Sequence, residues 1–70
     1  MKIADIEKGD LIVYKNGKTN YVNKPFKYEI WFNSRLENVQ NHKYDIAKVK
    51  RYVKFLCFYR LKTIYKRKEI

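Results

Sequence analysis

The chain has 70 residues, enough for one small domain, and a chain of this size buries only about 60% of the surface that its unfolded form exposes. Hydrophobic residues make up 46% of it and aromatic residues 17%, which excludes the composition typical of disordered chains. A net charge of +10 opposes compaction and indicates an acidic partner, either nucleic acid or an acidic protein surface. We therefore predict a single domain over residues 1–70.

The sequence contains no feature of a secreted or membrane-spanning protein. Its single cysteine, Cys57, has no partner for an internal disulfide. The first ten residues have no apolar run typical of a signal peptide. The longest nearly apolar run, residues 55–59, is far too short to span a bilayer. We expect a reducing cytosol and no membrane.

The first predicted element is a β-hairpin centred on Asn16-Gly17, between two segments of high β propensity. An Asn-Gly pair between apolar runs favours a type I′ turn, in which both central residues have positive φ. A two-residue loop would place these residues opposite one another: Lys15 and Lys18, Val13 and Asn20, Ile12 and Tyr21.

The middle of the chain is predicted to continue as strand and turn. Residues 27–33, KYEIWFN, alternate in a way that indicates a strand with one apolar face. Asn33 then suits the cap of a short helical turn over residues 35–39, and residues 41–43 form a loop. Trp31 fits equally well as a core residue or as an exposed binding aromatic.

The segment from residue 44 onward is both ambiguous and strongly cationic. It has nine basic residues after residue 45 against one acid, Glu69, and so carries +8 of the total charge. Residues 46–58 fit a helix by one spacing and a strand by another, and residues 63–67 resemble a final strand. We expect the following apolar residues in the core: Val49, Val53, Phe55, Leu56 and Phe58.

Three blocks of the sequence resemble a family of short uncharacterised proteins from Firmicute phages and prophages. The blocks are DIEKGDLIVYKNGKTNYV (5–22), YDIAKVKR (44–51) and LKTIYKRKE (61–69). The resemblance implies a mainly β fold with at most a short helix, plausibly a small, partly open SH3-like barrel. It favours strand over helix for residues 46–51 and implies no activity, because none is established for that family.

The sequence offers little for catalysis, and we predict no enzyme, no metal site and no cofactor. His42 and Cys57 have no third group to orient them, so an exposed loop histidine and a buried structural cysteine are the better readings. Asp5, Glu7 and Asp10 cluster near the first turn and are interpreted as solvated loop residues.

The cationic segment predicts a non-enzymatic nucleic-acid-binding surface. Lysine and arginine neutralise phosphates, and exposed aromatic rings stack on unpaired bases. The predicted phosphate contacts are Lys48, Lys50, Arg51, Lys54, Arg60, Lys62, Lys66, Arg67 and Lys68. The predicted stacking residues are Tyr52, Tyr59 and Tyr65.

A second hypothesis is a host-takeover or anti-defence inhibitor, comparable to an anti-CRISPR protein, that binds a host protein or ribonucleoprotein. The sequence leaves open DNA against RNA, any base preference, the protein target, and a homodimer formed through an edge strand.

Overall fold

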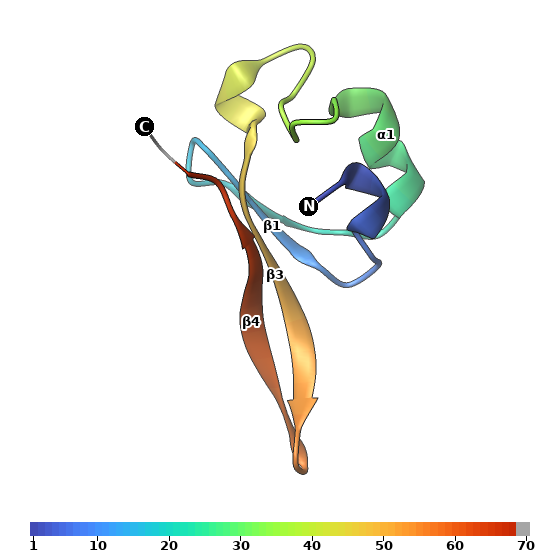
Figure 1. Ribbon diagram of the computed structural model, residues 1–70, viewed down its shortest axis with the longest axis vertical. Helices are drawn as coiled ribbons and strands as arrows, with labels where there is room; N and C mark the ends of the chain where they lie inside the picture. The colour runs from blue at the N-terminus through green and yellow to red at the C-terminus, as the bar shows by residue number, and fades with distance from the viewer. Residues whose placement is uncertain (69–70) are drawn as a thin grey trace.

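The computed structural model describes residues 1–68, and Glu69, the one acid of the cationic segment, lies outside the described residues. Four antiparallel strands form one open sheet in the order β2-β1-β3-β4 (Figure 1). The strands are β1 (Leu11–Tyr14), β2 (Thr19–Tyr21), β3 (Ile46–Phe55) and β4 (Phe58–Lys66). The helical elements are all short: η1 (Ile3–Asp5), η2 (Pro25–Lys27), α1 (Tyr28–Trp31) and η3 (His42–Tyr44). The mainly β class is thus confirmed, and none of these described helices is long and apolar enough to cross a bilayer.

The predicted hairpin is confirmed, but its predicted register is wrong by one residue. Ile12 lies opposite Asn20, and Val13 lies opposite Thr19. The loop has three residues because Gly17 alone takes positive φ, at 85°, whereas a type I′ turn needs two such residues. The Gly17 amide donates to the Tyr14 carbonyl at 2.9 Å, which closes a tight turn followed by one left-handed residue.

The predicted strand over residues 27–33 is wrong, since most of this segment forms η2 and α1. Pro25 is the first residue of η2, where its lack of an N–H group loses no helical hydrogen bond. Tyr28 and Phe32 lie four residues apart, which brings their rings to one side of the turn, 5.5 Å apart and stacked. Burying this pair leaves Ile30 and Trp31 exposed, so helical spacing rather than alternation selects the core residues.

The segment that returns to β3 is held by asparagine side chains. The helical turn predicted over residues 35–39 does not form; the Asn33 side chain instead accepts from the amides of Arg35 and Glu37. The predicted loop at residues 41–43 runs into η3, whose first turn is capped by the side chain of Asn41. Such side-chain bonds to the backbone substitute for regular structure.

Residues 46–55 are strand, including residues 46–51 for which the resemblance favoured it, and they pair with β4 from residue 48 onward. β1 accompanies β3 only between Ile46 and Lys50. Residues 51–62 therefore continue past the sheet as a two-stranded hairpin, which we call the arm (Figure 1). The arm explains the elongated shape, with principal extents of 41 × 28 × 19 Å.

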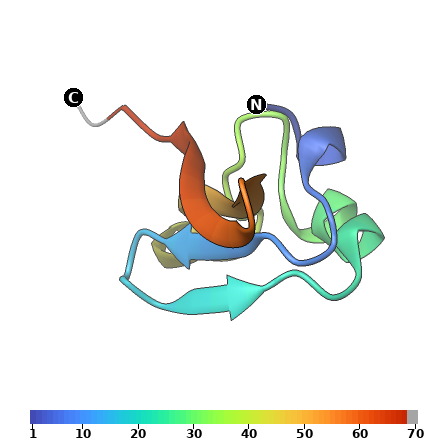
Figure 2. The same ribbon diagram turned by 90° about the horizontal axis from the view of Figure 1, so that it is seen from below.

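The core lies on one side of the sheet, beneath the helical turns and the loops that connect them (Figure 2). Its buried residues all lie in the part of the described chain outside the arm, residues 1–50 and 63–68, which we call the body: Ile6, Ile12, Val22, Tyr28, Phe32, Leu36, Ile46 and Val49. No buried residue of the cluster lies in the arm.

A buried ion pair joins the N-terminal loop to β3. Asp10 is 1% exposed, so its prediction as a solvated loop residue is wrong. Its carboxylate accepts from Arg51 Nε and Nη2, both at 2.9 Å, and from the Glu7 amide at 2.9 Å. The hydrogen bond to Asp10 raises the pKa of the Arg51 guanidinium, which keeps the pair charged.

We expect Asp10→Asn to destabilise the protein by about 2–4 kcal/mol, because it leaves a partly buried Arg51 without its charged acceptor. Urea unfolding followed by circular dichroism measures this loss. The matched control is Glu7→Gln, whose exposed carboxylate lies 3.5 Å from Arg51 Nε and should matter by less than about 0.5 kcal/mol. Equal losses in the two variants would contradict the assignment.

Alkaline pH should weaken the fold through Tyr28. Burial raises the pKa of its phenol above the ordinary value of 10.0. The folded state thus holds the phenol proton more tightly than the unfolded state. The contribution of Tyr28 to the free energy of unfolding is therefore fully present below pH 10 and is lost as the pH rises above 10. Melting curves from pH 8 to 11.5 should show this decline, and Tyr28→Phe should flatten it. Tyr21→Phe, at an exposed phenol whose pKa is raised by its hydrogen bond to Tyr52, is the control and should flatten it less.

Candidate nucleic-acid interface

The register of the sheet decides which cationic side chains share a face. Successive residues of a strand point to opposite faces, and cross-strand partners point to the same one. Val49 is fully buried, so the even-numbered residues of β3 from Lys48 to Lys54 point away from the core. Their β4 partners follow from the pairing: Lys48 with Lys66, Lys50 with Thr63, Tyr52 with Leu61, and Lys54 with Tyr59.

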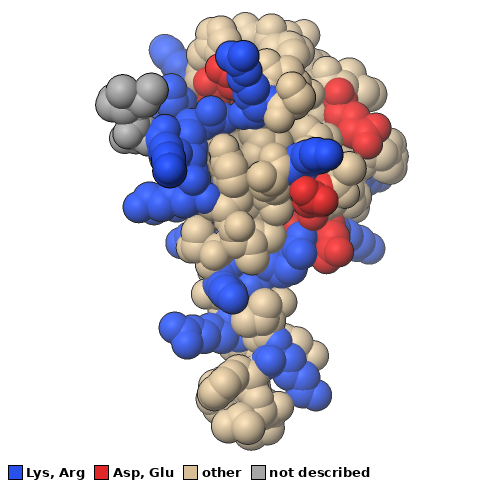
Figure 3. Space-filling view, viewed as in Figure 1, with Lys and Arg blue, Asp and Glu red and all other residues tan. Residues whose placement is uncertain are grey.

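The face of the sheet opposite the core, the outer face, therefore combines lysines with tyrosines. It holds four lysines and three tyrosines: Lys48, Lys50, Lys54, Lys66, Tyr21, Tyr52 and Tyr59. The Tyr21 and Tyr52 hydroxyls lie 3.3 Å apart, which shows directly that β2 and β3 present them on the same side. None of the four strands contains an acidic residue. The acidic side chains visible in Figure 3 lie on the body, and none lies on the arm.

Two of the nine predicted phosphate contacts are occupied within the fold. Arg51 is bound to Asp10 and also donates to the Asp5 carbonyl at 2.8 Å. Arg67 donates to three backbone carbonyls, of Ile46, Arg35 and Leu36, at 2.9–3.0 Å. These arginines hold the fold together, because their donors are directed at internal acceptors and not outward.

The remaining predicted cations are divided between two sides of the molecule. Arg60 and Lys62 lie opposite Val53 and Arg51 and so point to the core side of the sheet, but on the arm, where no body covers them. Lys68 follows the end of β4. It lines a shallow surface hollow at the end of the outer face, together with Ala47, Lys48, Lys66 and Arg67.

The three predicted stacking tyrosines differ in their exposure. Tyr52 and Tyr59 are 50% and 70% exposed on the outer face and present their rings to solvent. Tyr65 packs against the core and is not free to stack. Tyr21 was missed by the sequence reasoning, because only the pairing of β2 with β1 brings it beside Tyr52.

Several residues predicted to be buried are instead exposed at the end of the arm. Val49 is in the core as predicted, and Val53 is half-buried. Phe55, Leu56 and Phe58 are exposed, and the prediction of a buried Cys57 is also wrong. Their hydrophobicity suggested burial, but within residues 1–68 no other element reaches this far along the hairpin.

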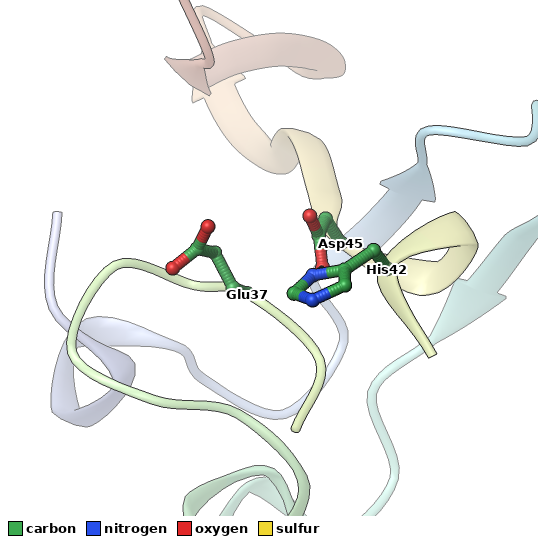
Figure 4. Close-up of side chains that lie close together, drawn as sticks. All are labelled: Glu37, His42 and Asp45. Carbon is green, nitrogen blue, oxygen red and sulfur yellow. Dashed lines mark ion pairs between the residues drawn. The ribbon is translucent and has the colours of Figure 1, made fainter. Parts of the chain in front are cut away.

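One cluster in the described chain has the side chains of a metal site: Glu37, His42 and Asp45, whose ligand atoms lie within 4.8 Å of one another (Figure 4). Two of these groups already have structural roles. Asp45 accepts from the Asn38 amide at 2.8 Å, and Glu37 accepts from Asn33 Nδ2 at 3.1 Å. His42 is an exposed residue, as expected, with its Nδ1 3.5 Å from the Asp45 carboxylate. We assign this cluster to the fold of the loop.

Comparison of the chain with protein-family models, with curated proteins and with solved structures found no match. The resemblance to phage proteins therefore stays a prediction, and function must be argued from the geometry of the chain itself.

The facing lysines at the end of the sheet should cost stability. Lys48 and Lys66 are direct cross-strand partners, and like charges so placed repel. We expect Lys66→Glu to stabilise the fold by about 0.2–1 kcal/mol in 20 mM salt, measured by thermal melting. Lys27→Glu makes the same change in charge outside the sheet and is the control. Salt at 500 mM should reduce the gain through screening; a gain that salt leaves unchanged would contradict this explanation.

Proposed function

We propose that this protein is a non-enzymatic nucleic-acid-binding module that uses the outer face of its sheet. The observation that supports this best is the shared face of Lys48, Lys50 and Lys54 with the exposed rings of Tyr52 and Tyr59. Alternation along one strand places Lys50 about 7 Å from Lys48 and about 13 Å from Lys54, so an extended phosphate backbone can contact several of them at once. The tyrosines between them supply flat apolar surfaces for bases.

Three finer features belong to the same proposal. The four-strand sheet corresponds to a partly open SH3-like barrel, the source is a phage or prophage, and the site of action is the host bacterial cytoplasm. The sheet supports the first of these only by its antiparallel order and its two hairpins.

A second candidate function is a host-takeover or anti-defence inhibitor that binds an acidic host protein or a ribonucleoprotein. The exposed aromatic and aliphatic side chains at the end of the arm favour it, because such side chains are common anchors in protein interfaces. A pull-down from nuclease-treated bacterial lysate tests it. This candidate requires a partner that the intact protein retains and that a variant altered at the end of the arm loses.

The test of the first proposal compares two triple variants of equal charge. Lys48→Gln, Lys50→Gln and Lys54→Gln remove lysines of the outer face; Lys24→Gln, Lys27→Gln and Lys43→Gln remove lysines outside β3 and β4. Fluorescence anisotropy with labelled single- and double-stranded DNA and RNA, between about 50 and 200 mM salt, measures affinity and its salt dependence.

We expect the outer-face variant to bind at least tenfold more weakly at 50 mM salt. The slope of log K against log salt should fall by about 2 to 3, as for the loss of three phosphate contacts. The control variant should change affinity by no more than about threefold. Equal effects in the two variants would place the interface elsewhere, and no binding to any nucleic acid at low salt would refute the proposal.

A further inference from the structure

The end of the arm is an apolar tip exposed to solvent on a cationic support. The tip consists of Phe55, Leu56, Cys57, Phe58 and Tyr59. Leu56 is 78% exposed, and Phe55 and Phe58 are 58% and 55% exposed. In Figure 3 the tip forms the uncharged lower end of the molecule, with basic side chains directly above it. A small protein with so little core leaves these large apolar side chains uncovered.

The turn itself adds a backbone cost to this exposure. Leu56 has φ of 58°, in the left-handed region that leucine avoids, while Cys57 does not. A positive φ at the first of two central residues is the pattern of a type II′ turn, where glycine is preferred. Backbone strain of this kind clusters at functional sites, so a leucine in this position supports a role for the turn in binding.

The charges of β3 and β4 argue against two simple partners, a second copy of the chain and an anionic membrane. A second copy that paired along the edge strand β4 would bring Arg60, Lys62 and Lys66 against the same cations of its partner. An anionic membrane could accept the apolar tip and pair with Lys54, since apolar side chains at an interface reach about 5–10 Å into the headgroup boundary. The Lys48–Lys66 pair, however, lies seven residues behind Phe55, or about 23 Å at 3.3 Å per residue, and would be left in bulk water.

A nucleic-acid duplex can contact the cations along the full length of the arm and the outer face. Because its phosphates run alongside an inserted ribbon, cations on both faces of the arm, and those between the arm and the body, can each contact a phosphate. Apolar side chains such as leucine and phenylalanine act as wedges between base pairs when they enter the minor groove, and the resulting kink opens that groove. The minor groove of B-form DNA is about 6 Å wide, and once the kink has widened it, it can hold the tip on both sides, whereas that of A-form RNA is wide and shallow.

We propose that the arm binds the minor groove of double-stranded DNA and that Leu56 and Phe58 insert between base pairs, which unstacks and bends the duplex. This inference rests on the proposed function and adds to it the kind of nucleic acid and the mode of contact. Lys54, Arg60 and Lys62 hold the flanking phosphates, and the outer face continues the contact toward the body.

The test uses a DNA duplex with dyes at its ends for energy transfer and 2-aminopurine at its centre. The intact protein should raise both energy transfer and 2-aminopurine fluorescence. The variant Leu56→Asn with Phe58→Ser removes the wedge and suits the turn, because asparagine tolerates positive φ. We expect it to fold, to lose both signals and to bind at least tenfold more weakly with an unchanged salt slope, because the phosphate contacts remain.

The matched control is Ile30→Ser with Val39→Ser, at two apolar residues of the body that are exposed to a similar degree. It should leave bending, unstacking and affinity within twofold of the intact protein. Duplex RNA of the same sequence should show no bending. In addition, duplex DNA should slow the modification of Cys57 by a water-soluble maleimide at least tenfold, because this thiol lies in the tip.

The outcomes separate this inference from the function beneath it. Salt-dependent binding of duplex DNA without bending or unstacking would refute the insertion of Leu56 and Phe58 but not the proposed function. No binding of any nucleic acid overturns both. Tip-dependent binding to phosphatidylserine vesicles, with no distortion of DNA, would assign the tip to a membrane and overturn the inference.

Discussion

The buried carboxylate of Asp10 is the constraint on which both the body and the arm depend. It holds Arg51 at the point where β3 leaves the sheet, and it accepts the Glu7 amide that shapes the loop before β1. Because strand side chains alternate, fixing Arg51 toward the core side sends Lys50 and Tyr52 to the outer face. The ion pair therefore agrees with the burial of Val49 in placing Lys50 and Tyr52 on the outer face.

The fold divides its cations between structure and surface. Arg51 and Arg67 carry several fixed donors each and are used to bind carboxylate and carbonyl oxygens within the fold. The lysines, which are single flexible charges, remain outward on the sheet and the arm. This division follows from the chemistry of the two side chains, since a guanidinium satisfies several acceptors from one position and an ammonium is strongly hydrated.

Local patterns predicted the first hairpin but not the middle of the chain. The Asn-Gly turn indicated a hairpin, which was found, whereas residues 46–58 fitted both a helix and a strand, and only the resemblance favoured strand, for residues 46–51. The register failed because it depends on whether one or two residues take positive φ, which the dipeptide does not decide. Residues 28–31 became a helical turn because Tyr28 and Phe32 stack in the core, a packing gain that alternation in the sequence does not reveal.

The sequence by itself determined the mainly β class, the first hairpin and the concentration of charge after residue 45, because these depend on residue type and short-range spacing. Tertiary structure alone decided which cations are free. Asp10 and Arg51 are 41 residues apart, and no local signal shows that they pair. It also decided that the aromatic residues at 55–59 are exposed: hydrophobicity predicts burial only where a body exists to cover the chain, and the arm extends beyond it.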